Sequence, residues 1–508
     1  MRLTRRGLLR HGGAGAATAA ALAGLPGAAR AAGSGKERRR AVLIVLPLVR
    51  ADHVKAFKDG DGADTPNLND LTGDSLRFDR AVPECMPSLP VRRTLITGMR
   101  SYPFRDWRRT EGMPAVPGYN PPWDWQPVMT EVTSAASVRT IYVTDSPIVS
   151  GPRFPEARRP GGAPAAAKPP SDGIRSEIEA IERSTRATER TFKAGISALG
   201  EVKDEDSFFV AVDPFDPVDA IAAPPIYVRP GVVEHDGIGP MSERLVELKF
   251  SDGDTKPLRS AYRDHVEAVD DRLGKLLDAV PDDTLVFVLG DIGYSLGDHS
   301  FLGRGTPTSY RRAYEIPYLI RHPDGEKGGD SIEWYASTHD VPTTILAHLG
   351  LTIPGKMRGE DLTALFDDVD QWDLPDRPFS ITASGQLIIV RDDRFLMVAD
   401  REQIERRLYD DDEEAEDDIT RYDDIANEEP GKLTDMSAAA LAVAGGTLPE
   451  FGPDGALRPL RQRGDDDADD DGIPNDFDAV DNDEPDDGVT PEALRYDGRD
   501  AEDRSGAR

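Results

Sequence analysis

Pro83-Glu-Cys-Met-Pro-Ser-Leu-Pro-Val-Arg-Arg-Thr-Leu-Ile-Thr-Gly98 is a stretch in which a hydroxyl residue stands where a loop gives way to a predicted helix. Ser88 is a favoured N-cap residue, and Pro90 suits the first helical turn, where its missing N–H is not needed. Arg92 follows one turn later on the same face. Because a helix N-terminus presents free N–H groups and a partial positive charge, this pair suits attack on a phosphate or sulfate ester. The alternative is an ordinary serine cap beside a solvated arginine.

Apolar runs on both sides of this stretch, of which residues 41–46 are unbroken, predict strands buried on both faces of a parallel sheet. The runs occupy residues 41–46, 139–143, 207–212, 284–289 and 318–320. Apolar residues at three- and four-residue intervals predict helices over residues 174–199, 260–280 and 340–349. This alternation predicts a doubly wound α/β domain, in which ligands bind beyond the carboxyl ends of the strands. Because Pro47, Asp213 and Asp291 each follow such a strand, we expect the chemistry to converge there.

A chain of 508 residues exceeds one typical core, so we expect one large domain with smaller additions. The α/β domain is assigned to residues 41–375. Short strand-like runs at 379–382, 386–390 and 395–398, with an Ala-rich helix at 437–443, predict a small antiparallel C-terminal α+β subdomain over residues 376–445. Residues 446–508 lose hydrophobic periodicity and are predicted to form an Asp-rich, acidic tail.

The N-terminus has the order of an export signal. Twin arginines in Thr4-Arg5-Arg6-Gly7-Leu8-Leu9 precede a small-residue apolar run, and Ala29-Arg30-Ala31 offers a cleavage site. Residues 1–31 therefore resemble a twin-arginine signal, and the alternative is a disordered basic arm. The apolar run is too short to span a bilayer, so no transmembrane segment is expected in the mature chain. We expect the mature protein in the periplasm, at the cell surface or outside the cell.

Charge and cysteine content exclude several classes of protein. The net charge of -32 disfavours nucleic acid and anionic membranes as partners. A single cysteine, Cys85, rules out an intrachain disulfide and a cysteine-based zinc site. We expect Cys85 to be a small buried apolar side chain.

Short motifs run in a fixed order from the first strand to the small subdomain. They are residues 41–46 with Arg50-Ala51-Asp52-His53, Thr65-Pro66-Asn67-Leu68, Ser88-Leu89-Pro90-Val91-Arg92 with Leu95-Ile96-Thr97-Gly98, residues 289–299 and 314–323, His339-Asp340-Val341-Pro342-Thr343 and Leu408-Tyr409-Asp410. This order resembles that of the sulfatases, within the alkaline phosphatase superfamily, over roughly residues 41–445. The resemblance implies a doubly wound, mostly parallel sheet and an activity on sulfuric or phosphoric esters.

Four positions depart from the family's pattern at its metal site. In the family the first strand ends in an Asp ligand, often with a second ligand beside it, but Pro47 and Leu48 stand here. The family's Asp-His pair is Asp291-Ile292, and a family histidine corresponds to Val218. These four replacements carry no metal-binding atom and no transferable proton. A family lysine is also replaced, by Arg304.

The resemblance implies that Ser88 and Arg92 are the catalytic residues and that Asp291 is the remaining ligand of a degenerate metal site. Family members use this position either as formylglycine or directly as Ser or Thr, and the sequence leaves both open. Cys85 lies three residues too far from Gly98 to be the matched residue. Because calcium takes about 6 to 8 oxygen ligands, a lone aspartate is a poor cage, which disfavours a divalent metal in the main site.

Two functions remain open. The first is an exported sulfatase-family protein that has lost efficient hydrolysis and binds a sulfated or phosphorylated small molecule, a glycan or a partner protein. The alternative is an active sulfuric- or phosphoric-ester hydrolase that uses Ser88, or its formylglycine form, with a rebuilt metal site. The residues available for rebuilding it are Asp52, His53, Asp213, Asp216 and Asp298.

The tail contains a second motif, Asp467-Ala-Asp469-Asp-Asp471-Gly472-Ile-Pro-Asn475-Asp-Phe-Asp478. Its spacing matches loops that wrap oxygens around calcium, with a glycine at the sharp turn. The predicted ligands are Asp467, Asp469, Asp471, Asn475 and Asp478. The motif resembles a thrombospondin type 3 calcium repeat, and the alternative is a solvated acidic tail.

Overall fold

The computed structural model describes residues 39–57, 62–108, 110, 113, 117–161, 174–216, 252–297, 302–303, 311–366, 374–384, 387–400, 403, 406–410 and 424–448. The predicted export signal, Val218, Asp298, Arg304 and the calcium motif at 467–478 lie outside these residues. Among the residues that the structure describes, every helix is too short or too polar to cross a membrane.

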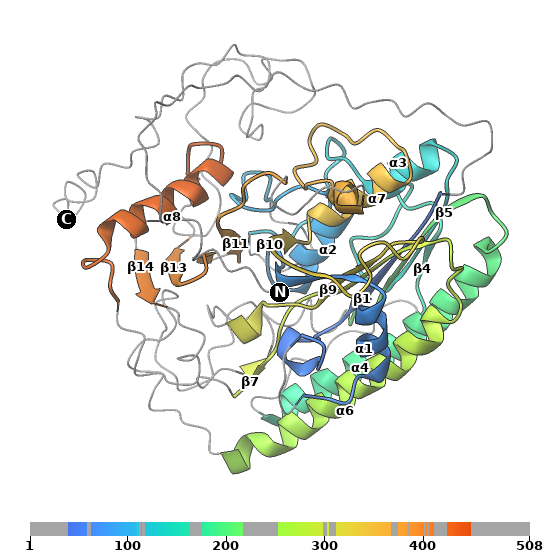
Figure 1. Ribbon diagram of the computed structural model, residues 1–508, viewed down its shortest axis with the longest axis horizontal. Coiled ribbons are helices and arrows are strands. Elements are labelled where there is room, and N and C mark those ends of the chain that lie inside the picture. Colours follow the sequence, from blue (N-terminus) through green and yellow to red (C-terminus); the bar gives the residue numbers. More distant parts are fainter. Residues whose placement is uncertain are drawn as a thin grey trace. The chain divides into compact units, whose positions relative to one another are not determined.

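A mostly parallel sheet of eight strands forms the centre of the large domain, in the order β10-β2-β9-β6-β1-β5-β3-β4 (Figure 1). The strands are β1 (Arg39–Leu46), β2 (Leu76–Val82), β3 (Arg139–Thr144), β4 (Ala157–Arg158), β5 (Ser207–Asp213), β6 (Leu285–Gly290), β9 (Tyr318–Arg321) and β10 (Ser331–Ser337). The central strand β1 pairs in parallel with β5 and β6. Since residues 41–46 are fully buried, the predicted two-sided burial of this run is confirmed.

One strand runs against the prediction. The run at 318–320 was expected to be parallel, but β9 is antiparallel to both β6 and β2. At the end of the β6–β9 pairing, Gly290 N donates to Pro317 O at 2.9 Å. An antiparallel neighbour, unlike a parallel one, needs no crossover connection.

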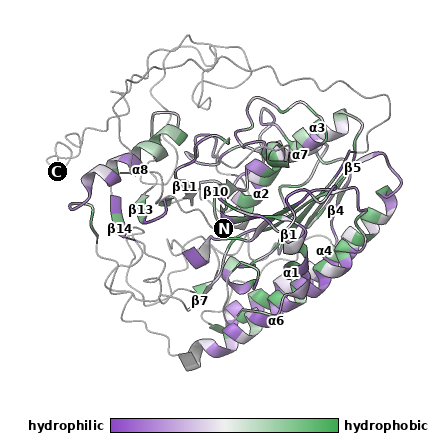
Figure 2. Ribbon diagram, in the orientation of Figure 1, coloured by the Kyte–Doolittle hydropathy of each residue, from purple (hydrophilic) through white to green (hydrophobic). Residues whose placement is uncertain are grey.

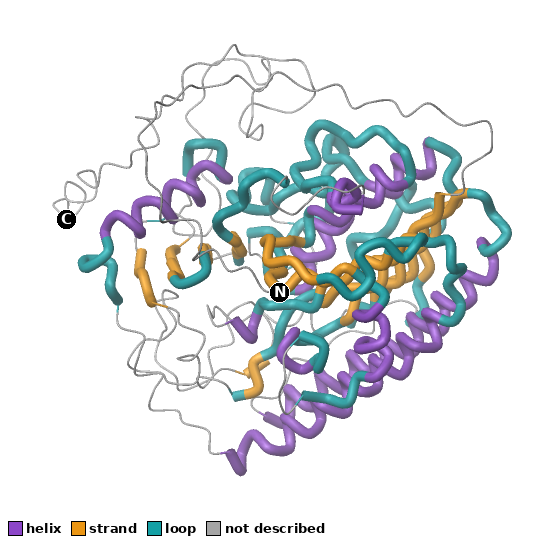
Figure 3. The backbone as a smooth tube through the Cα atoms, viewed as in Figure 1, coloured by secondary structure: helices purple, strands orange, loops and turns teal. Residues whose placement is uncertain are grey.

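Helices cover both faces of the sheet, so the doubly wound α/β fold is confirmed (Figures 1 and 3). The helices α1 (Pro66–Gly73), α4 (Ile174–Val202) and α6 (Asp252–Leu277) lie on one face. The helices α2 (Ser88–Thr97), α3 (Met129–Ala135) and α7 (Asp340–His348) lie on the other, and η2 (Ala51–His53), η4 (Arg311–Ala313) and η5 (Leu362–Phe366) are short 3-10 turns. Polar and apolar residues alternate along α4 in Figure 2, because its buried residues recur every third or fourth position.

Two glycines set how closely α4 and α6 approach their neighbours. A Cβ on Gly195 of α4 would lie 2.8 Å from Val212 of β5, and one on Gly274 of α6 would lie 2.2 Å from Asn67 of α1. Asp270 of α6 also caps α1, because its carboxylate accepts from the backbone N of Asn67 at 3.1 Å and of Leu68 at 2.8 Å. The predicted Thr-Pro-Asn-Leu motif thus begins a helix that docks on α6.

The small C-terminal subdomain is also confirmed as an antiparallel sheet with one helix. Its strands are β11 (Ser380–Ala383), β12 (Leu387–Arg391), β13 (Phe395–Asp400) and β14 (Arg406–Asp410), and its helix is α8 (Pro430–Val443). A separate short ladder joins β7 (Ser295–Leu296) to β8 (Leu302–Gly303). The subdomain holds the loop before α2, since Met86 N donates to Ala383 O at 2.7 Å and Ala383 N donates to Glu84 O at 2.9 Å.

A buried ion pair fixes the start of α7. The carboxylate of Asp340 accepts from Ser337 N at 2.8 Å and Glu360 N at 2.9 Å, and it receives both guanidinium nitrogens of Arg377 at 2.8 and 2.9 Å. Burial alone would raise the pKa of Asp340, but Arg377 and the hydrogen bonds lower the pKa to about 2.

We expect this pair to contribute to acid resistance. The folded pKa of Asp340 lies below the ordinary aspartate value of about 3.9, so its contribution is complete above about pH 4 and is lost as the pH falls towards 2. The loss should be about 2 kcal/mol of unfolding free energy. Asp340→Asn should remove this pH dependence and destabilise the protein by about 3–5 kcal/mol at pH 7.

Denaturant titrations at pH 7 and pH 3 measure both effects. The matched control is Asp124→Asn, since Asp124 is an exposed residue. Equal stability of the two variants at pH 7 would contradict the assignment.

Candidate functional site

Ser88 begins helix α2 but does not cap it. The N-cap position belongs to Pro87 and has no side-chain hydrogen bond, so the predicted serine cap is wrong. Pro90 lies in the first turn, as predicted, and Arg92 returns along the same face to donate from Nη1 to Ser88 O at 3.3 Å. Both Ser88 and Arg92 are buried.

Arg92 brings together two of the predicted strand-end residues. Its Nε and Nη2 lie 3.0 and 2.9 Å from Asp213 Oδ1, at the end of β5. Its Nη1 donates to Asp291 Oδ2 at 2.5 Å, just beyond β6. Since β1 lies between β5 and β6, the guanidinium bridges the carboxyl edge of three adjacent strands.

Burial and neighbouring charges shift the pKa values of Arg92 and Asp213 in opposite directions. Burial alone would lower the pKa of Arg92, but Asp213 and Asp291 raise it above its usual range, so the guanidinium stays charged. Burial raises the pKa of Asp213, and Arg92 opposes that rise. Asp291 Oδ1 accepts from the backbone N of Leu48 at 2.7 Å and of Ile292 at 2.8 Å. The dipoles of these two N–H groups therefore stabilise part of the negative charge of Asp291 that a second cation would otherwise stabilise.

Hydrocarbon side chains occupy the positions where the resemblance places metal ligands. Leu48 and Ile292 are fully buried. Leu48 has a left-handed backbone with φ 61°, a conformation that costs a branched side chain energy. The strain is held in place by its N–H, which donates to Asp291, and by its carbonyl, which accepts from Tyr262 Oη at 2.6 Å.

Helix α6 supplies two residues that no sequence pattern selects. Tyr262 Oη also accepts from Arg50 N at 3.0 Å, and His265 Nε2 lies 2.9 Å from Pro47 O. Together these side chains fix the loop that leaves β1. They would have been recognisable only once α6 was placed beside that loop.

Three of the other residues available for rebuilding a metal site, Asp52, His53 and Asp216, are paired elsewhere. Asp52 pairs with Arg50 and lies 3.1 Å from His53 Nδ1. Burial would raise the pKa of Asp52, but Arg50 and His53 hold it well below its usual range. Asp216 pairs with Arg183 at 3.0 Å. Within the described ranges, no three His, Cys, Asp or Glu side chains are grouped so that they could hold a metal ion.

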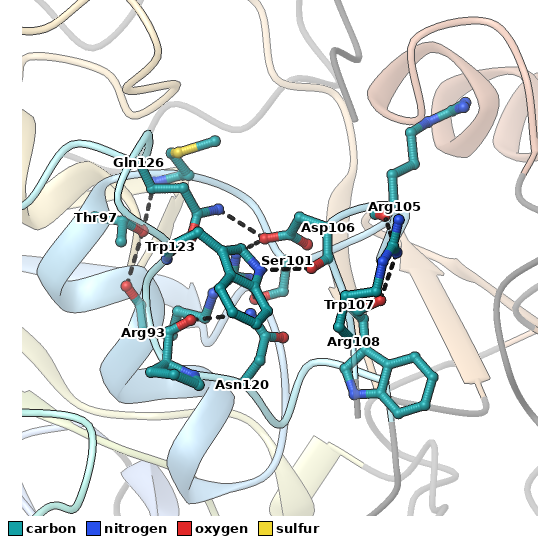
Figure 4. A network of polar contacts seen from close by, with 12 residues as sticks. Arg93, Thr97, Ser101, Arg105, Asp106, Trp107, Arg108, Asn120, Trp123 and Gln126 are labelled. Carbon is teal, nitrogen blue, oxygen red and sulfur yellow. Dashed lines mark hydrogen bonds and ion pairs between the residues drawn. The ribbon is translucent and has the colours of Figure 1, made fainter. Parts of the chain in front are cut away.

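Arg93, next to Arg92, is directed into a second polar network (Figure 4). It pairs with Asp106, whose Oδ2 accepts from Gln126 Nε2 at 2.7 Å and whose carbonyl accepts from Trp123 Nε1 at 2.7 Å. Burial lowers the pKa of Arg93 to about 10. The double arginine is the one sequence signal for this network, which anchors the loop after α2.

Cys85 has the expected role of a small buried side chain. It is free and fully buried, and burial followed by the charge of Glu84 raises the pKa of the thiol well above its usual range. A thiol with so little thiolate is a poor nucleophile.

Comparison with known proteins assigns the fold and a family domain. Residues 188–351 match the family model described as Sulfatase. The multifunctional alkaline phosphatase superfamily protein PehA of Trinickia caryophylli is 25% identical over 399 residues, which cover 64% of this chain and 76% of that protein. Residues 188–351 therefore match a sulfatase-family domain, which agrees with the predicted resemblance over that part of the chain.

Solved structures agree on the architecture. Phosphonate monoester hydrolase of Agrobacterium radiobacter superimposes with a TM-score of 0.59 at 18% identity, covering 83% of this chain and 100% of that one. A 2-O GAG sulfatase superimposes with a TM-score of 0.59 at 15% identity, covering 79% of this chain and 91% of that one. At these identities the likeness shows that the fold is shared.

We expect Tyr262→Phe to destabilise the protein. The change leaves Leu48 O and Arg50 N buried without their shared hydroxyl partner, which should lower the free energy of unfolding by about 1–3 kcal/mol in denaturant titrations. The matched control is Tyr318→Phe, because the Tyr318 hydroxyl is buried without a hydrogen-bond partner among the described residues. The control should be neutral or slightly stabilising. An equal loss in both variants would argue against the role of Tyr262.

Proposed function

We propose that this protein is an exported, sulfatase-fold protein that binds a sulfated or phosphorylated ligand and hydrolyses esters weakly or not at all. The observation that carries the proposal is the composition of the sheet edge beside Ser88. Leu48 and Ile292 are hydrocarbon side chains there, and the charges of Asp213 and Asp291 are already met by Arg92.

The residues at this edge do not fit a divalent metal. Hard cations need several oxygen ligands, and Leu48 and Ile292 offer none from their side chains. A catalytic metal stabilises charge on a reacting ester by several kcal/mol, and each ~1.4 kcal/mol changes the rate tenfold. A site without one is therefore expected to be slower by about a thousandfold or more.

The ligand class follows from the relatives and from the position of the site. The fold is shared with a 2-O GAG sulfatase and with a phosphonate monoester hydrolase. An ester oxyanion, on a small molecule or on a surface glycan, would be favoured near the N-terminus of α2, where free N–H groups and the helix dipole attract negative charge. The acidic surface implied by the net charge of -32 argues against nucleic acid.

The second candidate is an active sulfuric- or phosphoric-ester hydrolase. It is favoured by Ser88, which matches the family's nucleophile position at the first residue of α2. Such an enzyme would use this serine, or its formylglycine form, with ligands drawn partly from outside the described residues, such as Asp298.

Turnover of an aryl sulfate, an aryl phosphate and a phosphonate monoester separates the two functions. We expect the full-length protein to show no turnover above that of Ser88→Ala, while both bind a sulfated oligosaccharide in calorimetry. Ser150→Ala is the matched control, because Ser150 is exposed and its hydroxyl bonds only to the nearby Pro147 O. Turnover that persists in Ser150→Ala and disappears in Ser88→Ala would establish the hydrolase.

We also propose that the tail binds calcium and that the twin-arginine signal directs export; both proposals rest on sequence spacing. Calcium titration of the full-length protein should give a binding isotherm, because the motif offers several carboxylates at loop spacing. The isotherm should be lost in the variant Asp469→Asn with Asp471→Asn. A wild-type protein that takes up no calcium, or a variant that binds calcium as well as wild type, would overturn the proposal that this motif is a calcium-binding loop.

A further inference from the structure

The geometry points to Arg92 as a built-in cation that occupies the space between Asp213 and Asp291 and leaves no room there for a bound metal ion. The inference deepens the proposed function, on which it rests for its functional meaning. It makes Arg92 a positioning residue of the sheet edge, in place of the ligand-binding role that the resemblance implies.

The nitrogens of the Arg92 guanidinium are engaged by the protein itself. A guanidinium has five N–H groups and no acceptor. The Nε–H donates to Asp213, Nη1 donates to Ser88 O and Asp291, and Nη2 donates to Pro214 O and lies 2.9 Å from Asp213. Every nitrogen of the guanidinium therefore donates to an acceptor of the protein.

The guanidinium and both carboxylates are shielded from solvent. Its carbon lies 5.2 Å from the centre of the Phe215 ring, and the exposure of Arg92, Asp213 and Asp291 is 1%, 0% and 1%. Two buried carboxylates at one site repel each other unless a cation lies between them. An arginine stays charged at any physiological pH, so it meets that need permanently.

The ion pairs join a helix to two strands of the sheet. The two carboxylates come from the ends of β5 and β6, which flank β1, while the cation comes from α2. The ion pairs therefore tie α2 to both strands and, through Asp291, to the strained backbone of Leu48. A divalent ion would have to displace a side chain that is itself part of the fold.

Thermal unfolding of full-length variants tests the inference. Arg92→Ala leaves two unpaired buried carboxylates, and its Tm should fall by roughly 5–10 °C. Methylguanidinium at low millimolar concentration should recover part of this shift by filling the vacated position. Arg175→Ala is the matched control, because the side chain of Arg175 is 89% exposed; its Tm should move little and should not respond to methylguanidinium.

Two further variants keep the test decisive. Arg92→Lys keeps the charge but loses the fork of donors, so its Tm should lie between those of wild type and Arg92→Ala. If Arg92→Ala does not fold, Arg92→Met combined with Asp213→Asn and Asp291→Asn decides the question, since removing all three charges should restore folding. Failure of this neutral variant would overturn the inference, as would a Tm of Arg92→Ala equal to that of Arg175→Ala.

Metal dependence separates this inference from the proposed function. The variant Asp469→Asn with Asp471→Asn, which removes the tail motif, should show the same Tm in EDTA, Mg²⁺, Ca²⁺ and Mn²⁺. A Tm that rises with one of these ions would overturn the inference that Arg92 occupies the place of a metal ion. Ester turnover that depends on Ser88, with a Tm indifferent to EDTA, would refute the proposed function and leave the built-in cation intact.

Discussion

The ion pairs of Arg92 with Asp213 and Asp291 are the constraint on which the site depends. They join helix α2 to the ends of β5 and β6, two strands that lie on either side of β1. A buried charge is stable only when it is paired and its hydrogen bonds are met, and here every guanidinium nitrogen donates to an acceptor of the protein. The same pairing fixes the chemistry available at the sheet edge, because it leaves no free cationic donor beside Ser88.

The loop after β1 shows how the rest of the edge adapts to that pairing. Asp291 accepts from the N–H of Leu48, and Tyr262 donates to the Leu48 carbonyl. These two bonds hold Leu48 in a left-handed conformation that its side chain disfavours. Polar contacts at this point are made by backbone groups, while the side chains of Leu48 and Ile292 are hydrocarbon, so the edge is stable but poor in groups for ester chemistry.

Much of the architecture could be predicted from hydrophobic patterning. The runs at 41–46, 207–212 and 284–289 are strands because their residues are buried on both faces, and that burial is visible in the sequence itself. Direction is not visible: the apolar run at 318–320 does not show that β9 is antiparallel to β6. The strand β2 reads Leu-Arg-Phe-Asp-Arg-Ala-Val, and its charged residues conceal a strand whose neighbours are fixed only by tertiary contacts.

The site was predictable in part. Spacing identified Ser88, Asp213 and Asp291 at a helix start and at strand ends, and the structure places Asp213 and Asp291 around Arg92. The serine cap was wrong because the entry of the chain into α2 is set by the bonds of its loop to Ala383, which no local preference encodes. Tyr262 could not be found either, since its partners lie 212 and 214 residues away.

The most direct test of Arg92 as a built-in cation is a crystal of the full-length protein soaked in Mn²⁺ and measured at the manganese edge. We expect no anomalous peak between Asp213 and Asp291, with density for the Arg92 guanidinium in that position. A manganese peak coordinated by both carboxylates, with Arg92 displaced, would contradict that expectation.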